Sequence, residues 1–260
     1  MTHLAPAFVS ALDIESIERA TVAAVAPDRC DEWSGWLLPM DAGTIGRAHS
    51  AVPLSHAFDT APDKVLRHII QQYQRHGHAP VFRLPDTALA LHEVLQQRGF
   101  KPHQATWVQV AAVADMANLC QADALVWQVT VNHQPDAAWQ SVFLGPGFDP
   151  VDAAARVRNL SRAEHCLYLQ VMHKGQAVAC GAASVSHGWL GVHGMRTAAS
   201  YRCQGLAAAI LCEMASQAQA MGLARAFLQV DTGNTSALNL YQRVGFGPVW
   251  RYAYWKVPAG

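Results

Sequence analysis

Two blocks near the C-terminal end of the chain hold the residue types best suited to chemistry. The first reads Arg202-Cys203-Gln204-Gly205-Leu206-Ala207 and opens a long helical pattern. A helix start leaves several backbone N–H groups free to converge on one anion, and the helix dipole favours negative charge there. Gly205 lets the backbone approach that anion, Ala207 keeps the next turn small, and Arg202 can add a charge-assisted contact. This block predicts a pyrophosphate-binding loop, in which we interpret Cys203 as a small loop residue rather than a nucleophile.

The second block is a predicted helix that runs from Asn234 towards Gly245-Phe246. Asn234 stands at the start of this helix, where it can cap the free N–H groups and also contact a cofactor. Tyr241 lies one turn after Ala237, on a helix whose other face is apolar. A phenol held over a departing thiolate can act as a general acid, and we expect this role for Tyr241. The alternative is a core tyrosine whose hydroxyl has a structural partner.

The stretch Val192–Thr197, directly before the loop, is a predicted strand. An arm with two amides, such as the pantetheine of coenzyme A, is best held by an exposed strand edge. We expect the backbone around Met195, Arg196 and Thr197 to supply it. His193 would share a strand face with Met195 and Thr197, because side chains alternate along a strand. It is therefore a candidate base for an acceptor amine, and a structural histidine is the alternative.

The elements around these blocks alternate between helix and strand, which is typical of an α/β class. In the first half, the predicted segments are helices at 10–26, 62–76 and 87–98, and strands at 32–40, 45–53, 81–84 and 106–113. In the second half, they are strands at 125–131, 165–173, 176–186, 189–197, 226–230 and 249–257, and helices at 136–143, 152–161, 203–221 and 235–244.

The two halves share one order of elements, which indicates an internal repeat. Gln96-Gln97-Arg98-Gly99-Phe100 ends a helix in the first half, and Gln242-Arg243-Val244-Gly245-Phe246 ends the matching helix in the second. We predict two domains, 1–113 and 124–260, joined by a low-charge linker at 114–123. The first copy has lost its chemistry, because Leu95 stands at the Tyr241 position and Ala88 at the Asn234 position. The alternative is that Gly-Phe is merely a common helix ending.

The composition excludes several classes of protein. Half of the 260 residues are apolar, and 19 basic residues balance 19 acidic ones, so nothing favours nucleic acid or an anionic membrane. The six cysteines form no Cys-x-x-Cys pair, so we expect reduced thiols and no structural metal. The chain shows no basic, apolar leader and no apolar run of about 18 residues. We expect a cytoplasmic protein, either a monomer or a homodimer.

Arg202-x-x-Gly205-x-Ala207 and Asn234-x-x-Ala237-x-x-Leu240-Tyr241, followed by Gly245-Phe246, resemble the GNAT superfamily of N-acyltransferases. The resemblance covers about Leu125–Pro258 well, and Ala207 stands where the family most often has glycine. The first half resembles the family in layout, and Gly46–Pro53 resembles N-terminal domains of such bacterial proteins. The whole looks like a tandem GNAT protein with a degenerate N-terminal copy.

This resemblance implies two tandem domains, each with a mixed, mostly antiparallel twisted sheet flanked by helices. It implies acetyl-CoA or another acyl-CoA as co-substrate, without a metal. The acceptor would be a small-molecule or protein amine that attacks directly, without a covalent enzyme intermediate. A non-catalytic acyl-CoA sensor and a scaffold in which both copies have decayed are the alternatives. Residues expected at the cofactor are Met195, Arg196, Thr197, Arg202, Cys203, Gln204, Gly205, Leu206, Ala207 and Asn234.

Overall fold

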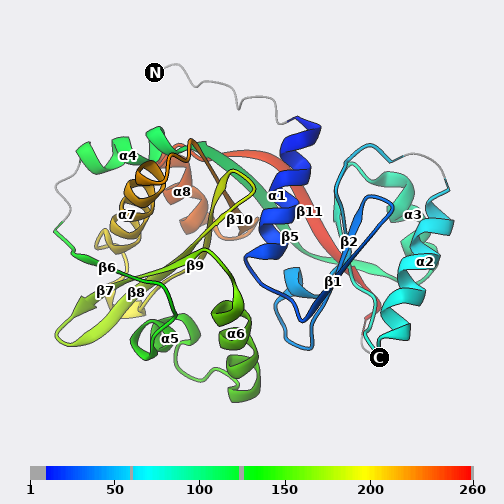
Figure 1. The fold of residues 1–260 in the computed structure, drawn as a ribbon, viewed down its shortest axis with the longest axis horizontal. Coiled ribbons are helices and arrows are strands. Elements are labelled where there is room, and N and C mark those ends of the chain that lie inside the picture. The colour runs from blue at the N-terminus through cyan, green and yellow to red at the C-terminus, as the bar shows by residue number, and fades with distance from the viewer. Residues whose placement is uncertain (1–9, 59–60, 123–125, 259–260) are drawn as a thin grey trace.

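The computed structural model describes residues 10–58, 61–122 and 126–258 (Figure 1). The first half contains, in order, α1 (Ala11–Ala23), β1 (Arg29–Trp33), β2 (Trp36–Met40), the 3-10 turn η1 (Gly46–Ala48), β3 (Val52–Pro53), α2 (Pro62–Arg75), β4 (Phe82–Pro85), α3 (Leu89–Gln97) and β5 (Lys101–Ala112).

The second half begins with α4 (Val113–Ala122), β6 (Val129–Asn132), α5 (Ala137–Leu144) and α6 (Pro150–Arg162). It continues with β7 (Cys166–His173), β8 (Gln176–Ser186), β9 (Trp189–Thr197), the 3-10 turn η2 (Ala199–Tyr201), α7 (Leu206–Ala220), β10 (Arg225–Asp231), α8 (Thr235–Arg243) and β11 (Gly247–Lys256).

Most strands join one eight-stranded sheet in the order β4-β11-β5-β10-β9-β8-β7-β6. Only β9 and β10 pair in parallel within it, and the other neighbours are antiparallel. A second sheet holds β1, β2 and β3. The mixed, mostly antiparallel architecture with flanking helices is therefore confirmed.

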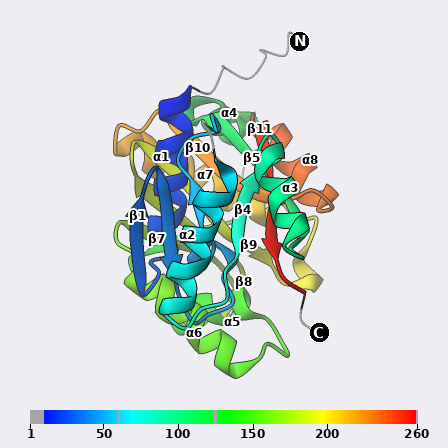
Figure 2. The same cartoon turned by 90° about the vertical axis from the view of Figure 1, so that its right-hand side faces the viewer.

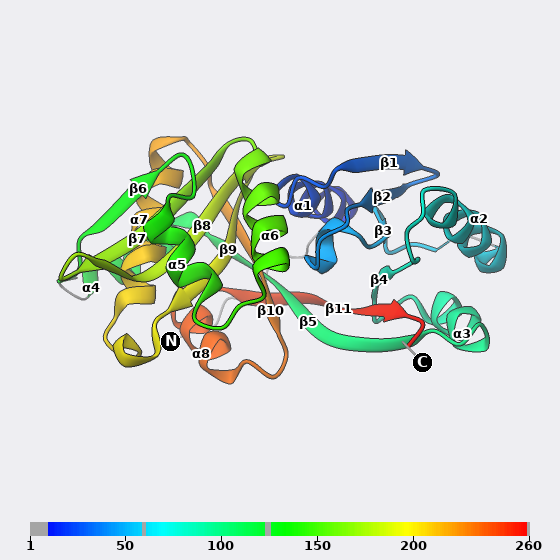
Figure 3. The same ribbon diagram turned by 90° about the horizontal axis from the view of Figure 1, so that it is seen from below.

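The long strands β5 and β11 tie the two halves together. Strand β5, which belongs to the first half of the chain, lies between β10 and β11, whereas β11 lies between β4 and β5. Figure 3 shows these two strands running side by side from one half into the other. Each half contributes a central strand to the same sheet. Main-chain hydrogen bonds therefore join β5 of the first half to β10 and β11 of the second, and one core cluster contains residues of both halves.

Helices cover both faces of the large sheet. On one face, α4, α7 and α8 pack on residues such as Leu169, Val192 and Leu228. On the opposite face, α1 packs on Phe227, and α5 and α6 pack on Tyr168. Helices α2 and α3 share a further core with the small sheet and β4, and both face the viewer in Figure 2.

Three of the expected segments fold differently. The expected strand at 32–40 is a hairpin of β1 and β2, because Ser34 and Gly35 have φ of 48° and 76° and make a tight turn. The expected strand at 45–53 begins instead with η1, and only Val52–Pro53 pairs with β2. The expected linker at 114–123 largely folds as α4, whose Met116 is fully buried against the core beside α7.

The thiols differ in part from the expectation that all are reduced. Cys30, Cys166, Cys180 and Cys203 are free, whereas Cys212 on α7 is disulfide-bonded. In the part of the chain that the structure describes, no helix has the length and apolar character needed to cross a membrane.

Candidate functional site

The central feature of the candidate site is a fork between β9 and β10. The two strands pair only where Leu190–Val192 faces Ala226–Leu228. Strand β9 nevertheless continues to Thr197 and β10 continues to Asp231. Beyond the pairing, β9 remains bonded to β8 and β10 remains bonded to β5, so their facing edges have no strand partner. The exposed strand edge expected to hold an amide-bearing arm is therefore at hand, and its binding role stays a prediction.

A β-bulge lies on β9 at the start of the fork. Cys180 of β8 pairs with Arg196, but Ala182 pairs with His193, so two steps on β8 correspond to three on β9. Gly194 takes up the extra residue with a φ of +59°, a left-handed conformation that favours glycine. Such an insertion reverses the alternation of side chains along the strand.

His193 consequently does not share a strand face with Met195, which corrects the sequence-based expectation. The His193 ring stands edge-on to Phe227, with ring centroids 5.7 Å apart, on the face covered by α1. Met195 packs on the opposite face, against the core that includes Ile210 and Met214 of α7.

Both nitrogens of His193 have partners. Arg47 Nη1 lies 3.2 Å from His193 Nδ1, and because guanidinium groups only donate, Nδ1 must be the acceptor. In the neutral ring, Nε2 then carries the proton and donates to Ser184 Oγ at 2.9 Å. Burial, and then the nearby charge of Arg47, hold the pKa of His193 well below its usual range. A neutral imidazole could accept a proton as a base. The nitrogen that would accept it, Nδ1, already accepts a hydrogen bond from Arg47.

The loop before α7 has the donors that an anion needs. The N-cap Gly205 has a φ of +82° and supplies no side-chain cap. Within the described chain, the backbone N–H groups of residues 203–208 have no hydrogen-bond acceptor. The next N–H group, that of Ala209, donates to Gly205 O. Arg202, Cys203 and Gln204 are exposed beside these donors. The predicted pyrophosphate loop thus has free amides and an adjacent cation, and its binding role stays a prediction.

Other contacts fix the shape of this loop. Trp127 Nε1 donates to Gln204 O at 2.8 Å, which anchors the loop to the segment just before β6. Cys203 has a φ of 59°, an uncommon conformation for a residue other than glycine. Arg196 Nη1 donates to Leu144 O at 2.9 Å, which ties the end of β9 to the end of α5.

Helix α8 and its N-cap carry the two residues that the sequence singles out, Asn234 and Tyr241. Asn234 caps the helix, since its Oδ1 accepts from Ala237 N–H at 3.2 Å. Tyr241 is 8% exposed, lies in the core on the α7 face, and stacks edge-on with Phe246. Its hydroxyl has no hydrogen-bond partner among the described residues, and burial raises the pKa of Tyr241 to about 12. The group is therefore protonated at neutral pH, and its role as general acid stays a prediction.

Sequence reasoning missed the polar residues on the α1 face of the fork. Arg47 on η1 reaches His193 and also Gln229 Oε1, the latter at 3.5 Å. Gln229 is held by Thr21 Oγ1 at 3.0 Å and by the Tyr252 hydroxyl at 3.2 Å. The sequence stretch Gly46–Pro53 includes Arg47, but nothing in its spacing points to a partner far along the chain.

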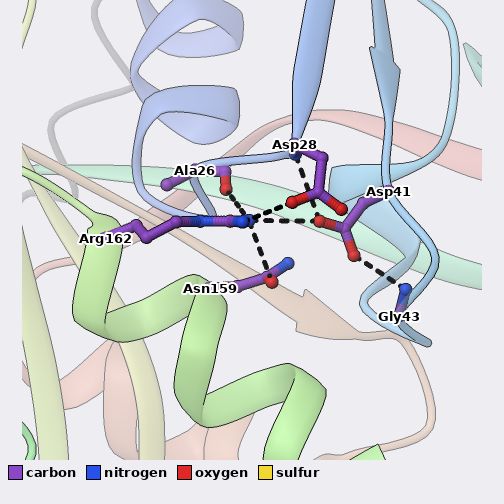
Figure 4. A network of polar contacts seen from close by, with 6 residues as sticks. All are labelled: Ala26, Asp28, Asp41, Gly43, Asn159 and Arg162. Atoms are coloured by element: carbon purple, nitrogen blue, oxygen red, sulfur yellow. Dashed lines mark hydrogen bonds and ion pairs between the residues drawn. The ribbon is translucent and has the colours of Figure 1, made fainter.

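An ionic junction fixes α6 to the first half of the chain (Figure 4). Arg162 at the end of α6 pairs with Asp28 and with Asp41, the latter at 3.2 Å, and donates to Ala26 O at 2.6 Å. Asp41 also accepts from Gly43 N–H at 2.7 Å. Burial would raise the pKa of Asp41, but these hydrogen bonds, together with those from Asn159 and Arg162, lower it overall. Helix α6, on the same face as His193, is thus held by the N-terminal half.

The comparisons with known proteins agree with this geometry. The chain matches the family described as "Probable histone acetyltransferase Rv0428c C-terminal" over residues 11–255 and belongs to it, within the GNAT N-acetyltransferase superfamily. It is 27% identical over 123 residues to an uncharacterized N-acetyltransferase, YobR, of Bacillus subtilis (strain 168). That alignment covers 46% of this chain and spans only half of YobR.

Two solved structures show the same fold along nearly the whole chain. A GCN5-related N-acetyltransferase from Kribbella flavida is 18% identical, with a TM-score of 0.68 and 97% of each chain covered. A tandem GNAT protein from the clavulanic acid biosynthesis pathway is 12% identical, with a TM-score of 0.64 and coverage of 96% of this chain and 94% of the other. The chain therefore shares the GNAT fold along nearly its whole length.

Proposed function

We propose that the protein transfers an acetyl group from acetyl-CoA to a primary amine by direct attack. The amine nitrogen bonds to the thioester carbonyl carbon, the carbon–sulfur bond breaks, and the thiolate takes up a proton as the amine loses one. The observation that carries the proposal is the unpaired edge of β9, which leads directly into the uncapped N-terminus of α7. Such an edge suits an amide-bearing arm, and the helix start suits its pyrophosphate.

Tyr241 is the proposed donor of the proton to the thiolate. Its hydroxyl lacks a competing partner among the described residues, and its raised pKa keeps the phenol protonated at neutral pH, as a general acid must be before the transfer. Met195 and Leu206 belong to or pack against the core that contains Tyr241, so the strand edge, the loop and the phenol lie on one face of the sheet. Asn234 holds the start of the helix that carries the phenol.

We infer that the first half, within 1–113, is a second copy of the fold that has lost its chemistry. The order α2-β4-α3-β5 parallels α7-β10-α8-β11, and the sheet order β4-β11-β5-β10 is symmetric about the β11-β5 pair. The N-cap residues Ala61 and Gly205 of α2 and α7 are both left-handed. The domain from 124 onward would then hold the active copy, with β5 supplied to its sheet by the first.

Matching helix endings support the same inference. Phe100 N–H donates to Leu95 O at 3.0 Å, and Phe246 N–H donates to Tyr241 O at 3.0 Å. Leu95 and Tyr241 thus occupy equivalent positions, and a leucine has no proton to give. The first copy would support the second through the shared strands rather than catalyse transfer itself.

Calorimetry with acetyl-CoA and a thiol-release assay with a panel of amines test the proposal together. Binding of acetyl-CoA with amine-dependent release of thiol supports an N-acetyltransferase. Binding without release by any amine would instead support an acyl-CoA sensor, and absence of binding would support a decayed scaffold. His193→Ala provides a further check, because an unshifted pH-rate profile would exclude His193 as the base.

A further inference from the structure

Arg47 places a guanidinium group at the fork, on the face of the sheet opposite α7. Its Nη1 lies 3.2 Å from His193 Nδ1 and 3.5 Å from Gln229 Oε1. His193 follows the last β9 residue that pairs with β10, and Gln229 follows the last β10 residue that pairs with β9. Arg47 therefore bridges the two strands where they part, on the side away from the predicted pyrophosphate loop.

The charge of Arg47 is not compensated. No carboxylate pairs with it in the described ranges, and its two neighbours, His193 and Gln229, are neutral. Its Nε and Nη2 donors have no acceptor among the same residues, and the side chain is half-buried. A partly desolvated cation without a counter-charge is costly, and a ligand that brings a carboxylate would offset that cost.

The fold holds Arg47 in this place. Gly46 lies so close to Tyr254 that a Cβ atom on it would approach the ring to 2.8 Å, so a larger residue would force that ring or η1 to shift. Ala48, on the other side of Arg47, is fully buried. The position of Gln229 is fixed in turn by Thr21 and Tyr252. The guanidinium is therefore presented by a packed turn rather than by a free surface loop.

We propose that the acceptor amine carries a carboxylate near its reacting nitrogen, and that Arg47 binds this carboxylate. The proposal rests on the proposed N-acetyltransferase function. A planar guanidinium with free Nε and Nη2 donors matches a carboxylate in two parallel hydrogen bonds. A basic protein tail would bring like charge to Arg47, so small amino acids are favoured over lysine-rich acceptors.

The test compares acceptors that differ only in this group, such as glycine with glycinamide and β-alanine with its amide. Wild type, Arg47→Gln and Arg47→Lys are assayed for thiol release with acetyl-CoA, with Arg158→Gln as a control on the exposed side of α6. We expect wild type to prefer the carboxylates and Arg47→Gln to lower kcat/KM for them about 10- to 100-fold, mainly through KM. The ratio of kcat/KM for each carboxylate to that for its amide should therefore fall, and Arg47→Lys should restore part of the preference.

Equal loss for carboxylates and amides in Arg47→Gln would overturn the proposal, as would a wild-type preference for a lysine-rich peptide. Dependence on Arg47 only with succinyl-CoA as donor would also overturn it, because the carboxylate would then belong to the acyl group. Calorimetric binding of the same amine pairs to the CoA-bound protein gives a readout without turnover. Carboxylate-selective binding that Arg47→Gln abolishes would support the proposal even if transfer failed, and unselective binding would count against it.

Discussion

His193 and Met195 are two residues apart on β9 and yet point to opposite faces of the sheet. The bulge at Gly194 separates them, so His193 faces α1 and Arg47 while Met195 faces α7. The fork is thereby given two chemically different sides. The α7 side holds the free helix amides and Tyr241, whereas the α1 side holds a polar network anchored by the N-terminal half.

Replacing Tyr241 by phenylalanine tests the proposed general acid. We expect kcat to fall about 100-fold, because a thiolate would have to leave without a positioned proton donor. The affinity for acetyl-CoA should stay within about twofold, and stability should change by less than about 1 kcal/mol, because the hydroxyl has no partner among the described residues. Steady-state kinetics with calorimetry measure all three, and unchanged turnover would make Tyr241 a core residue only.

Gly205→Ala tests the anion loop, with Gly222→Ala at the other end of α7 as a matched control. Both glycines have a positive φ, +82° and +73°, and a Cβ atom on either meets nothing within 4 Å. Both variants should lose about 1 kcal/mol of stability from the left-handed backbone. Only Gly205→Ala should weaken acetyl-CoA binding, by about 10-fold, because its methyl group stands among the free amides. Equal affinities in the two variants would argue that the loop does not bind the pyrophosphate.

Arg162→Ala tests the junction between α6 and the first half. The change leaves the buried Asp41 carboxylate without its cation and should cost about 1–2 kcal/mol of unfolding free energy, allowing for the partial exposure of Arg162. Arg158→Ala, on the same helix and exposed, should cost less than about 0.5 kcal/mol. Denaturant titrations of both variants provide the measurement, and equal midpoints would mean that the junction contributes nothing.

Four partly buried histidines predict a loss of stability in mild acid. Burial, and then the charge of Arg83, lowers the pKa of His56 to about 4, and burial also lowers the pKa of His49, His92 and His103. Because these folded-state pKa values lie below the unfolded value, the stability is complete above about pH 6.5 and declines as the pH falls towards the folded values.

His56→Phe isolates one contribution to this decline. The phenyl ring can keep the edge-on contact with Trp250 but takes up no proton. The variant should therefore lose about 1 kcal/mol less than wild type between pH 7.5 and pH 5, after allowance for partial exposure of His56. Thermal unfolding at the two pH values checks this, and parallel losses in both proteins would rule out His56 as a source.

Local sequence spacing predicts the parts of the site that depend on neighbouring residues. The free start of α7 at Gly205 and the cap of α8 by Asn234 follow from residues within one helical turn, and both are present. The matching helix endings at Gly99-Phe100 and Gly245-Phe246 are likewise local. In each, backbone hydrogen bonds between residues three and five positions apart close the helix. These features need no knowledge of the remainder of the chain.

The polar side of the fork depends on contacts that the linear sequence does not contain. The face occupied by His193 is set by the bulge, which exists only through the register between β8 and β9. The partnership of Arg47 with His193 spans 146 residues and requires α1, η1 and the shared strands β5 and β11 to pack against the C-terminal half.

The sequence by itself therefore determined the free start of α7, the capped start of α8 and most of the order of the elements, because helix ends and strand periods arise from short-range sterics and hydrogen bonding. Only the tertiary structure decided which face of β9 His193 occupies and that the Arg47 guanidinium lies beside it. Those outcomes arise from strand pairing and packing between distant segments, where one inserted residue reverses every following side chain.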